Sequence, residues 1–416
     1  MKEFRKRICP ILRSKPEGVL TLNQKNLLIV NNNLGIGGVQ RSLVNLLNEI
    51  KNDYNVTLFL FHTGGEYIGD IPEQITVIGT KGPLKVLGVS HQQSRKLGWS
   101  FFLTRGVLAL YSRLINNRLP IKLLVNTEKK KPSFDIAISF LHDFHEKILY
   151  GGCNQFVLDK VIAKKKIAFV HCDFLRSGGN TLNNRKLYRR FDKIAVVSTG
   201  TRKSFVAAIP ELNDRVYSIN NCHQYSEYIR LSKIDPIEYS EDSLNIITVS
   251  RLSPEKGLIR GLEVVKQLSE EGYKVHWHIV GDGPLAGIIL KEIEELHLHE
   301  NVTLYGNQKN PYRYIKNADV FLLPSFHEAA PMVFAEAKCL GVPIISTNTT
   351  SAQEMVMDDG AGWVCENSEQ GIYSSLKMLL NHPEIIVKCR EELLSRIYDN
   401  KKAIEEFHQL LNSSSQ

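Results

Sequence analysis

The sequence predicts an α/β protein of two domains, each built on a parallel β-sheet covered by helices. Its 416 residues exceed what a single hydrophobic core usually holds. Short runs rich in β-branched residues alternate with longer stretches of helical periodicity, which is typical of parallel sheets. A polar stretch of weak periodicity, residues 222–243, separates two such series and is interpreted as a linker.

Each half of the chain contributes its own series of strands, and these define an N-terminal domain (residues 1–221) and a C-terminal domain (residues 244–416). The strands expected in the first domain are Asn26–Asn31, Val56–Phe61, Thr76–Ile78, Asp135–Phe140, Lys166–Val170, Lys193–Val197 and Val216–Asn220. Those expected in the second are Leu244–Ser250, Val275–Val280, Val302–Tyr305, Val320–Leu323, Pro343–Ser346 and Gly362–Val364.

Composition narrows the class of protein further. The chain is 43% hydrophobic and 23% charged, as soluble globular proteins are. Its seven cysteines include no C-x2-C pair, which argues against a zinc site or a disulfide framework and favours a reducing cytosol. No apolar run approaches the roughly 20 residues of a membrane span, and the basic start lacks the apolar region of a signal peptide.

The net charge of +8 is concentrated in one segment. Residues 81–131 contain eleven lysines and arginines but a single acid, Glu128, and they include an apolar, aromatic stretch of helical period, Trp99–Ile115. Such a composition suits an interfacial helix on anionic lipid. It equally suits a helix that packs its apolar side on its own sheet and keeps its basic side chains in water. Both interpretations stay open, and no motif for nucleic acid is present.

Two glutamates eight residues apart, Glu328 and Glu336, follow the expected strand Val320–Leu323. Pro331 suits the first turn of a helix, so Met332–Leu340 is predicted to be helical. Glu328 would then lie in the loop at the strand's carboxyl end, where open α/β sheets bind ligands. The first N–H groups of the helix, at Met332 and Val333, suit a phosphate. A glycosidase pair would need carboxylates about 5–9 Å apart, whereas eight helical residues span about 12 Å.

A second signal opens the second domain, where Arg251 and Lys256 follow a strand and Gly257 comes directly after. Two cations at a sheet's carboxyl edge would stabilise the charge of a departing diphosphate. The alternative is a surface turn with solvated basic residues. A further glycine pair, Gly281 and Gly283, follows the next strand.

In the first domain, glycines and histidines follow the strands. Gly37 and Gly38 open a helix and permit a diphosphate to approach its backbone, but Gln40 stands where a dinucleotide fingerprint needs glycine, so an NAD site is not expected. His171 ends a strand and is expected at the ligand-binding edge, or else as a satisfied core histidine. The loop 140–146 has the spacing H-D-x-H, with His142, Asp143 and His145; without an obvious third ligand, acceptor contact is favoured over a metal.

Together these motifs resemble the retaining GT-B glycosyltransferases of family 4, the glycosyl transferases group 1, of the bacterial cell-surface polysaccharide type. The likeness covers residues from about 26 to 380 and is most specific at 251–257 and 328–343. Gln40 and Ala329 depart from it, since Glu and Gly are commoner there.

The resemblance implies two Rossmann-like domains facing a cleft, and it implies roles for individual residues. Arg251 and Lys256 would clamp the diphosphate, and Glu336 would accept the ribose hydroxyls. Glu328 would hold the transferred sugar, and His171 would lie near the reacting centre. The phosphates would face Gly37 and Gly38.

We therefore expect a metal-independent hexosyltransferase that takes a nucleoside-diphosphate sugar, with UDP favoured, and needs no other cofactor. Its acceptor is expected to be a polysaccharide or a lipid-linked glycan at the cytoplasmic face of the membrane, which segment 81–131 would contact. The alternatives are another GT-B activity, such as a sugar-nucleotide epimerase or a phosphorylase, and a non-catalytic nucleotide-sugar-binding protein.

Overall fold

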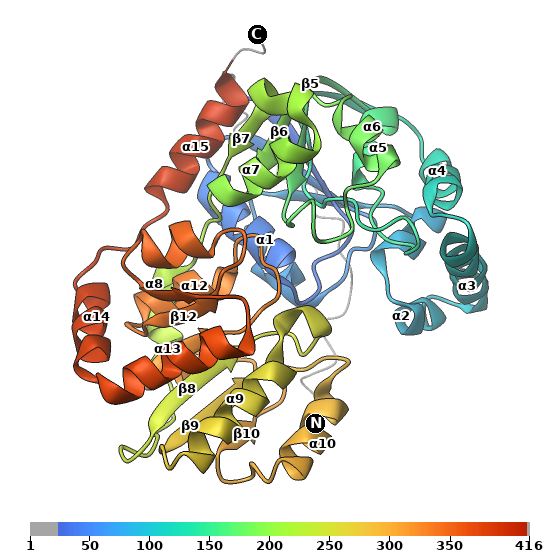
Figure 1. Ribbon diagram of the computed structural model, residues 1–416. Coiled ribbons are helices and arrows are strands. Elements are labelled where there is room, and N and C mark those ends of the chain that lie inside the picture. The colour runs from blue at the N-terminus through green and yellow to red at the C-terminus, as the bar shows by residue number, and fades with distance from the viewer. Residues whose placement is uncertain (1–23, 414–416) are drawn as a thin grey trace, which may run out of the picture. The chain divides into compact units, whose positions relative to one another are not determined.

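A computed structural model describes residues 24–413 and divides them into two compact units. The first unit contains the described residues up to Val197, the segment Arg202–Cys222, and the described residues from Lys401 onward. The second contains Ser198–Thr201 and His223–Asn400. Each unit is an α/β layer structure around its own parallel sheet (Figure 1), so the predicted fold class is confirmed.

The first unit is built on seven parallel strands in the order β3-β2-β1-β4-β5-β6-β7. This is the strand order of a doubly wound sheet: from β1 the chain first adds strands on one side (β2, β3) and then, from β4 on, on the other side, so the switch point lies between β1 and β4. The strands are β1 (Asn26–Asn31), β2 (Asn55–Leu60), β3 (Thr76–Gly79), β4 (Lys131–Ser139), β5 (Val161–Val170), β6 (Lys193–Val196) and β7 (Val216–Ser218).

Because both faces of this sheet are covered, its central strands are apolar throughout. In β1, all residues from Leu27 to Asn31 are buried, and successive side chains enter two different clusters. Leu28 and Val30 join Phe59 and Phe156 on one face, whereas Leu27 and Ile29 pack on the other. The helices are α1 (Gly38–Ile50), α2 (His91–Lys96), α3 (Trp99–Leu114), α4 (Arg118–Asn126), α5 (Cys153–Lys160), α6 (Leu182–Tyr188), α7 (Thr199–Ala208) and α15 (Lys401–Asn412).

The second unit repeats the design with six parallel strands in the order β10-β9-β8-β11-β12-β13. Here the winding reverses between β8 and β11. The strands are β8 (Leu244–Val249), β9 (Val275–Val280), β10 (Val302–Leu304), β11 (Val320–Leu323), β12 (Ile344–Thr347) and β13 (Gly362–Cys365). The α-helices are α8 (Tyr225–Ser232), α9 (Leu258–Glu270), α10 (Ala286–Glu295), α11 (Tyr312–Ile315), α12 (Met332–Cys339), α13 (Glu369–Asn381) and α14 (Glu384–Leu394).

The division into units differs from the expected boundaries at both ends of the second domain. The stretch expected as a linker contains α8, whose Tyr228 is fully buried against Tyr312 of the second unit. At the other end, α15 belongs to the first unit, where Phe407 and Leu410 are buried in the core. Lys193 of β6 donates to the Leu410 carbonyl over 2.7 Å, which satisfies an otherwise open helix end.

Candidate active site

The reversal of winding between β8 and β11 brings two loops together at the carboxyl edge of the second sheet. Such a switch point is where open α/β sheets bind ligands. The loop after β8 contains Arg251 and Lys256, and the loop after β11 contains Glu328. The structure therefore places the basic motif and the first glutamate of the other motif on neighbouring loops.

Gly257 allows these loops to meet. Its φ of 65° is left-handed, and a Cβ atom there would lie 2.0 Å from the Pro324 carbonyl oxygen. Only glycine fits such a backbone approach without strain. Phe326 N–H also donates to the Glu255 carbonyl over 2.8 Å, which joins the loops a second time.

Within this junction, Lys256 and Glu328 form an ion pair. Lys256 Nζ lies 2.6 Å from Glu328 Oε1, and both side chains are largely buried. Ser325 Oγ donates to the same carboxylate oxygen over 2.7 Å. Glu328 is thus held by two partners, with Oε1 accepting both hydrogen bonds. Sequence reasoning identified both charges but did not anticipate that they pair with each other, or that Ser325 takes part.

Arg251 lies on the same loop with its side chain exposed. Nearby, burial opposes the ionisation of Glu255, yet a hydrogen bond from Ser253 and the charges of Lys256 and Arg251 keep the pKa of Glu255 below its ordinary value. Arg251 therefore places an exposed positive charge on this loop. Such a charge favours anions, phosphates included.

The glycines after β9 hold the Arg251 loop in place from its other side. A Cβ atom on Gly281 would lie 1.9 Å from the Ser250 carbonyl oxygen, and one on Gly283 would lie 2.4 Å from that of Leu252. The Leu252 N–H donates to the Asp282 carbonyl over 3.1 Å. Close backbone packing accounts for these two glycines.

The helix α12 begins at Met332, as predicted, with Pro331 as its N-cap. Met332 and Val333 occupy its first turn, where N–H groups have no acceptor within the helix. Glu336 follows one turn later and is buried, with 7% of its surface exposed. The loop position of Glu328 and the helical position of Glu336 both agree with the sequence prediction.

Arg260 of α9 supports this site from behind. Its guanidinium donates to the carbonyls of Pro324 and Ser325 over 2.7 and 3.0 Å, and it stacks under the Phe326 ring at 4.0 Å. Arg260 therefore fixes the start of the Glu328 loop. Nothing in the sequence distinguished it from an ordinary surface arginine on an amphipathic helix.

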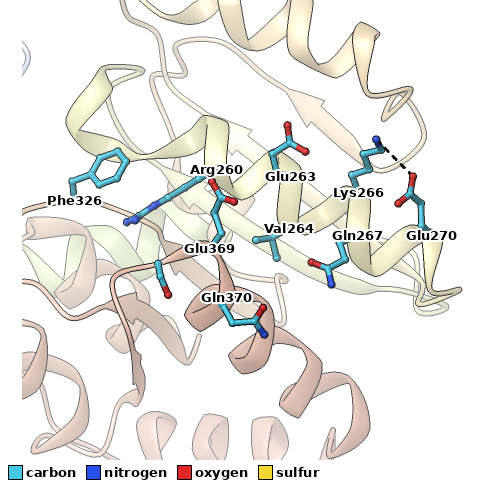
Figure 2. Close-up of a pocket in the computed structure, with 10 residues that line it drawn as sticks. Arg260, Glu263, Val264, Lys266, Gln267, Glu270, Phe326, Glu369 and Gln370 are labelled. Atoms are coloured by element: carbon cyan, nitrogen blue, oxygen red, sulfur yellow. Dashed lines mark ion pairs between the residues drawn. The ribbon is translucent and has the colours of Figure 1, made fainter.

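A groove of about 900 Å³ lies beside Arg260, between α9 and the start of α13 (Figure 2). Its charged lining consists of two cations, Arg260 and Lys266, and three carboxylates, Glu263, Glu270 and Glu369. Lys266 is already paired with Glu270 at 3.7 Å. A diphosphate would meet a net negative wall here, so the loop edge at Lys256 is the better anion site.

In the first unit, the expected residues lie at the carboxyl edge of the other sheet. Gly37 is the N-cap of α1, and Gly38 is its first residue. Gly35 N–H donates to Asn33 Oδ1 over 2.9 Å, and Ile36 N–H donates to Glu66 Oε2 over 3.2 Å. The loop is thus held open by side chains, at the switch point beside β1.

His171 follows β5 and packs among aromatic rings, with centroid distances of 4.6 Å to Phe140 and 5.6 Å to Phe169. Burial, then the nearby His142, lowers the pKa of His171 to about 3, so its imidazole is neutral at physiological pH. Its Nε2 is buried and lacks a hydrogen-bond partner within residues 24–413. A buried ring nitrogen of this kind is suited to a ligand hydroxyl.

His142 is the neighbour of His171 in the loop after β4. The two rings lie 6.4 Å apart, and burial lowers the pKa of His142 to about 4. In the same loop, the Asp143 carboxylate accepts from Gly152 N–H and Asn154 Nδ2 over 3.0 and 2.8 Å. Asp143 is thus committed to holding the chain at Gly152. His145 Nδ1 accepts from Lys147 N–H.

Comparison with known proteins bears on this site. Residues 232–396 match the family model of the glycosyl transferases group 1. The matched region contains Arg251, Lys256, Glu328 and Glu336.

Curated relatives agree with this match. The chain is 34% identical over 152 residues to a putative colanic acid biosynthesis glycosyltransferase, WcaL, of Escherichia coli, covering 34% of this chain and 37% of that protein. It is 27% identical over 178 residues to an uncharacterized glycosyltransferase of Methanocaldococcus jannaschii, covering 41% of this chain and 44% of that one. The aligned segments thus span less than half of these relatives' length.

Solved structures extend the likeness to nearly the whole chain. HepE of Anabaena, in complex with UDP and glucose, matches with a TM-score of 0.67 at 16% identity, covering 94% of this chain and all of that one. A TarM variant of S. aureus, in complex with UDP, fondaparinux and alpha-GlcNAc-glycerol, matches with a TM-score of 0.64 at 14% identity, with 94% and 100% covered. These likenesses confirm the GT-B fold.

Proposed function

We propose that this protein transfers a sugar from a nucleoside-diphosphate sugar to a hydroxyl group of a glycan acceptor, with retention of configuration. The observation that carries the proposal is the ion pair of Lys256 with Glu328, on the loops that follow β8 and β11 at the switch point of the second sheet, with Arg251 on the same loop as Lys256. The match of residues 232–396 to the family model of the glycosyl transferases group 1 supports it. UDP is the favoured nucleotide, because two structural neighbours are complexes with UDP.

In this proposal the diphosphate lies between the Arg251–Lys256 loop and the first turn of α12. As the bond from the sugar to the diphosphate breaks, negative charge grows on the leaving oxygen. Arg251, Lys256 and the N–H groups of Met332 and Val333 stabilise that charge. These cations supply the electrostatic role that a metal has in other enzymes, so we propose no resident metal and no further cofactor.

The acceptor hydroxyl attacks the same sugar carbon from the face that the diphosphate leaves. The new C–O bond forms with the acceptor's oxygen, and its proton passes to the departing phosphate oxygen. No side chain has to act as a nucleophile. Glu328 holds hydroxyls of the transferred sugar, and its ion pair with Lys256 sets its orientation. Glu336 accepts the ribose hydroxyls.

His171 contributes a neutral imidazole to the reacting centre. Because the pKa of His171 is lowered to about 3, the imidazole is neutral near pH 7 and does not change its protonation state there. Its Nε2 is suited to bind a hydroxyl of the donor sugar. For Gly37 and Gly38 we propose contact with the donor phosphates through their backbone N–H groups.

The acceptor we propose is a polysaccharide or a lipid-linked glycan of the cell envelope, met at the cytoplasmic face of the membrane. Two curated relatives, WcaL and the amylovoran biosynthesis glycosyltransferase AmsK of Erwinia amylovora, have names that refer to polysaccharide synthesis. Within the described residues, no helix has the length and apolarity needed to cross a bilayer. Contact with lipid would therefore be made at the surface.

A panel of UDP- and GDP-sugars tests the proposal. The correct donor should raise the melting temperature, since a ligand at a hundred times its Kd stabilises the folded state by about 2.7 kcal/mol. Release of nucleoside diphosphate on adding glycan acceptor should follow. Stabilisation without turnover would favour a binding protein, and isomerisation of the donor sugar would favour an epimerase. Absorbance of a Schiff base would reveal a phosphorylase. No response to any sugar nucleotide would overturn the donor site.

A further inference from the structure

The helix α3 turns a stripe of large apolar side chains toward solvent. Five residues form this α3 stripe, and each has between 59% and 69% of its surface exposed: Trp99, Leu103, Val107, Leu110 and Leu114. At 100° per residue, these positions fall within an arc of about 80° on the helix. A contiguous exposed apolar patch on one helix marks an interaction surface.

The opposite side of α3 already packs on the protein, so the stripe is not a misplaced core face. Phe101, Leu108 and Ala109 contact the core of the first unit, and Ser112 is buried. The helix therefore has two apolar sides, only one of which its own domain covers. Of the two interpretations left open by the sequence, packing on the sheet accounts for half of this helix and leaves the other half unexplained.

The next helix, α4, also exposes apolar side chains. Leu119 and Leu123 of α4 lie one turn apart and are about half exposed, whereas Ile121 and Leu124 on its other side are buried. Figure 1 shows α2, α3 and α4 at the outer edge of the first unit. Exposed apolar side chains thus occur on two consecutive helices of segment 81–131.

The basic rim of the stripe consists of exposed residues of this segment; Lys131 does not belong to it, because it pairs with Glu128 at 2.9 Å and lies over the Phe59 ring. Arg95, Lys96, Arg113 and Lys122 are exposed. Arg95 stacks on the Trp99 ring at 5.4 Å, and Arg113 stands between Leu110 and Leu114 in sequence. Arg105, by contrast, points inward and donates to the Val86 carbonyl over 2.6 Å. Arg105 is therefore a structural residue and not part of the charged rim.

We infer that the α3 stripe and its basic rim bind an anionic lipid surface, with α3 lying in the plane of the membrane. An apolar stripe bordered by cations and a tryptophan is the pattern of an interfacial helix. A second copy of this chain fits poorly, because a symmetric dimer across this face would oppose two segments of the same positive charge. This surface would bring the enzyme to the proposed lipid-linked acceptor. The inference of membrane binding rests on the proposed function only where it names that acceptor.

Vesicle co-sedimentation at low salt tests the inference on the full chain. Binding to vesicles with phosphatidylglycerol should exceed binding to phosphatidylcholine alone and should fall as salt rises. Leu103→Ser with Leu110→Ser should weaken binding by roughly tenfold per leucine, because each buries apolar surface in the membrane. The matched control is Val387→Ser with Ile397→Ser, which removes exposed apolar residues from the second unit and should bind as wild type.

Charge reversal provides an independent arm. Changing Lys96, Arg113 and Lys122 to Glu should weaken binding by about fivefold or more for each residue. Changing Lys233, Lys274 and Lys388 to Glu alters the net charge equally in the other unit and should have no comparable effect. Both triple variants should keep nucleotide-induced stabilisation and turnover on a soluble acceptor, which separates this test from that of the donor site.

Tryptophan emission locates the contact. Trp277 is fully buried, whereas Trp99 is exposed, so vesicles should shift the emission to the blue in the wild type and not in Trp99→Phe. The inference is overturned by equal binding to neutral and anionic vesicles, or by no binding at low salt. It is also overturned by a dimer that Leu103→Ser with Leu110→Ser dissociates, which would assign the stripe to a second copy.

Discussion

Lys256 Nζ lies 2.6 Å from Glu328 Oε1, although 72 residues separate the two in sequence. The pair joins the loop proposed to bind the diphosphate to the loop proposed to hold the sugar. In the proposed site, Lys256 would bind the diphosphate and also orient the carboxylate that holds the sugar. Binding of the diphosphate and of the sugar would then depend on each other. Truncating either partner leaves a charge that is largely buried and unpaired, which costs stability as well as catalysis.

For the basic loop, Arg251→Ala and Lys256→Ala should each lower turnover by about 10²–10³. Each variant removes a preorganised cation from the place where charge develops. Lys256→Ala should also lower the melting temperature, because it breaks the pair with Glu328, whereas the exposed Arg251 should not. Steady-state rates and thermal melts measure the two effects separately.

The control for the first prediction is another ion pair of the same unit. Lys377 lies 2.8 Å from Glu271, away from the loops that carry the site. Lys377→Ala should leave turnover unchanged. Wild-type rates in both Arg251→Ala and Lys256→Ala would show that the donor binds elsewhere.

The two glutamates should separate in binding experiments. Glu336→Gln should weaken binding of the nucleoside diphosphate alone, because a carboxylate accepts stronger hydrogen bonds from ribose hydroxyls than an amide does. Glu328→Gln should leave that affinity nearly unchanged and slow sugar transfer. Calorimetry with UDP, followed by rates with the UDP-sugar, distinguishes the variants.

A groove carboxylate supplies the control for these binding measurements. Glu369→Gln removes a negative charge from the groove of Figure 2. UDP affinity should be unaffected by it if the nucleotide binds at the loop edge. A loss of affinity in Glu369→Gln with none in Glu336→Gln would move the nucleotide to the groove.

Gly257 should be required because no side chain fits at this position, and not because the loop needs to be flexible. Gly257→Ala combines a left-handed backbone with a contact of 2.0 Å to the Pro324 carbonyl oxygen. The backbone strain alone costs about 1–2 kcal/mol, and the contact must also displace the Glu328 loop. We expect a lower melting temperature together with a large loss of turnover.

Gly272 allows the two causes to be separated. It is also left-handed, with φ of 86°, but a Cβ atom there would have no neighbour within 4 Å. Gly272→Ala should therefore cost only the backbone strain and should retain activity. Equal losses of activity in the two alanine variants would mean that the approach to Pro324 is unimportant.

Much of this architecture could be predicted from local sequence. All thirteen expected strands are present. They could be predicted because buried parallel strands have sequences rich in β-branched residues with few interruptions. The main errors are at the starts of two strands. Both β4 and β5 begin several residues earlier than expected, at Lys131 and Val161, where lysines and polar residues hide the extended pairing between these strands.

Features that depend on distant contacts could not be predicted in this way. The sequence gives no indication that α15 crosses to the first unit, or that Lys193 is buried there as the cap of its last turn. In the sequence, Arg105 looks like any other solvated basic residue of its segment. Only the fold shows that its guanidinium donates to the Val86 carbonyl. The motifs likewise identified Lys256 and Glu328 separately, since their pairing depends on how β8 and β11 align.

Acid should destabilise the protein through its buried histidines. Burial lowers the pKa of His142 to about 4 and, reinforced by nearby charges, lowers those of His171, His223 and His278 to about 3. In the unfolded chain, histidine titrates near pH 6.5. Between these values the unfolded state binds more protons than the folded state, so stability is complete above about pH 6.5 and falls as the pH decreases toward 4.

Each such histidine adds a slope of about 1.4 kcal/mol per pH unit in that window. The raised pKa values of Asp143 and Glu406, caused by burial, act in the opposite direction but belong to two groups against four. His278 packs on Tyr239 at 3.9 Å and bonds to Tyr305 and Asn245. Urea unfolding at pH 7 and pH 5 should show a marked loss for the wild type and a smaller one for His278→Asn. His299→Asn, at an exposed position, should retain the wild-type slope, and a slope unchanged in His278→Asn would show that this histidine is already protonated in the folded state.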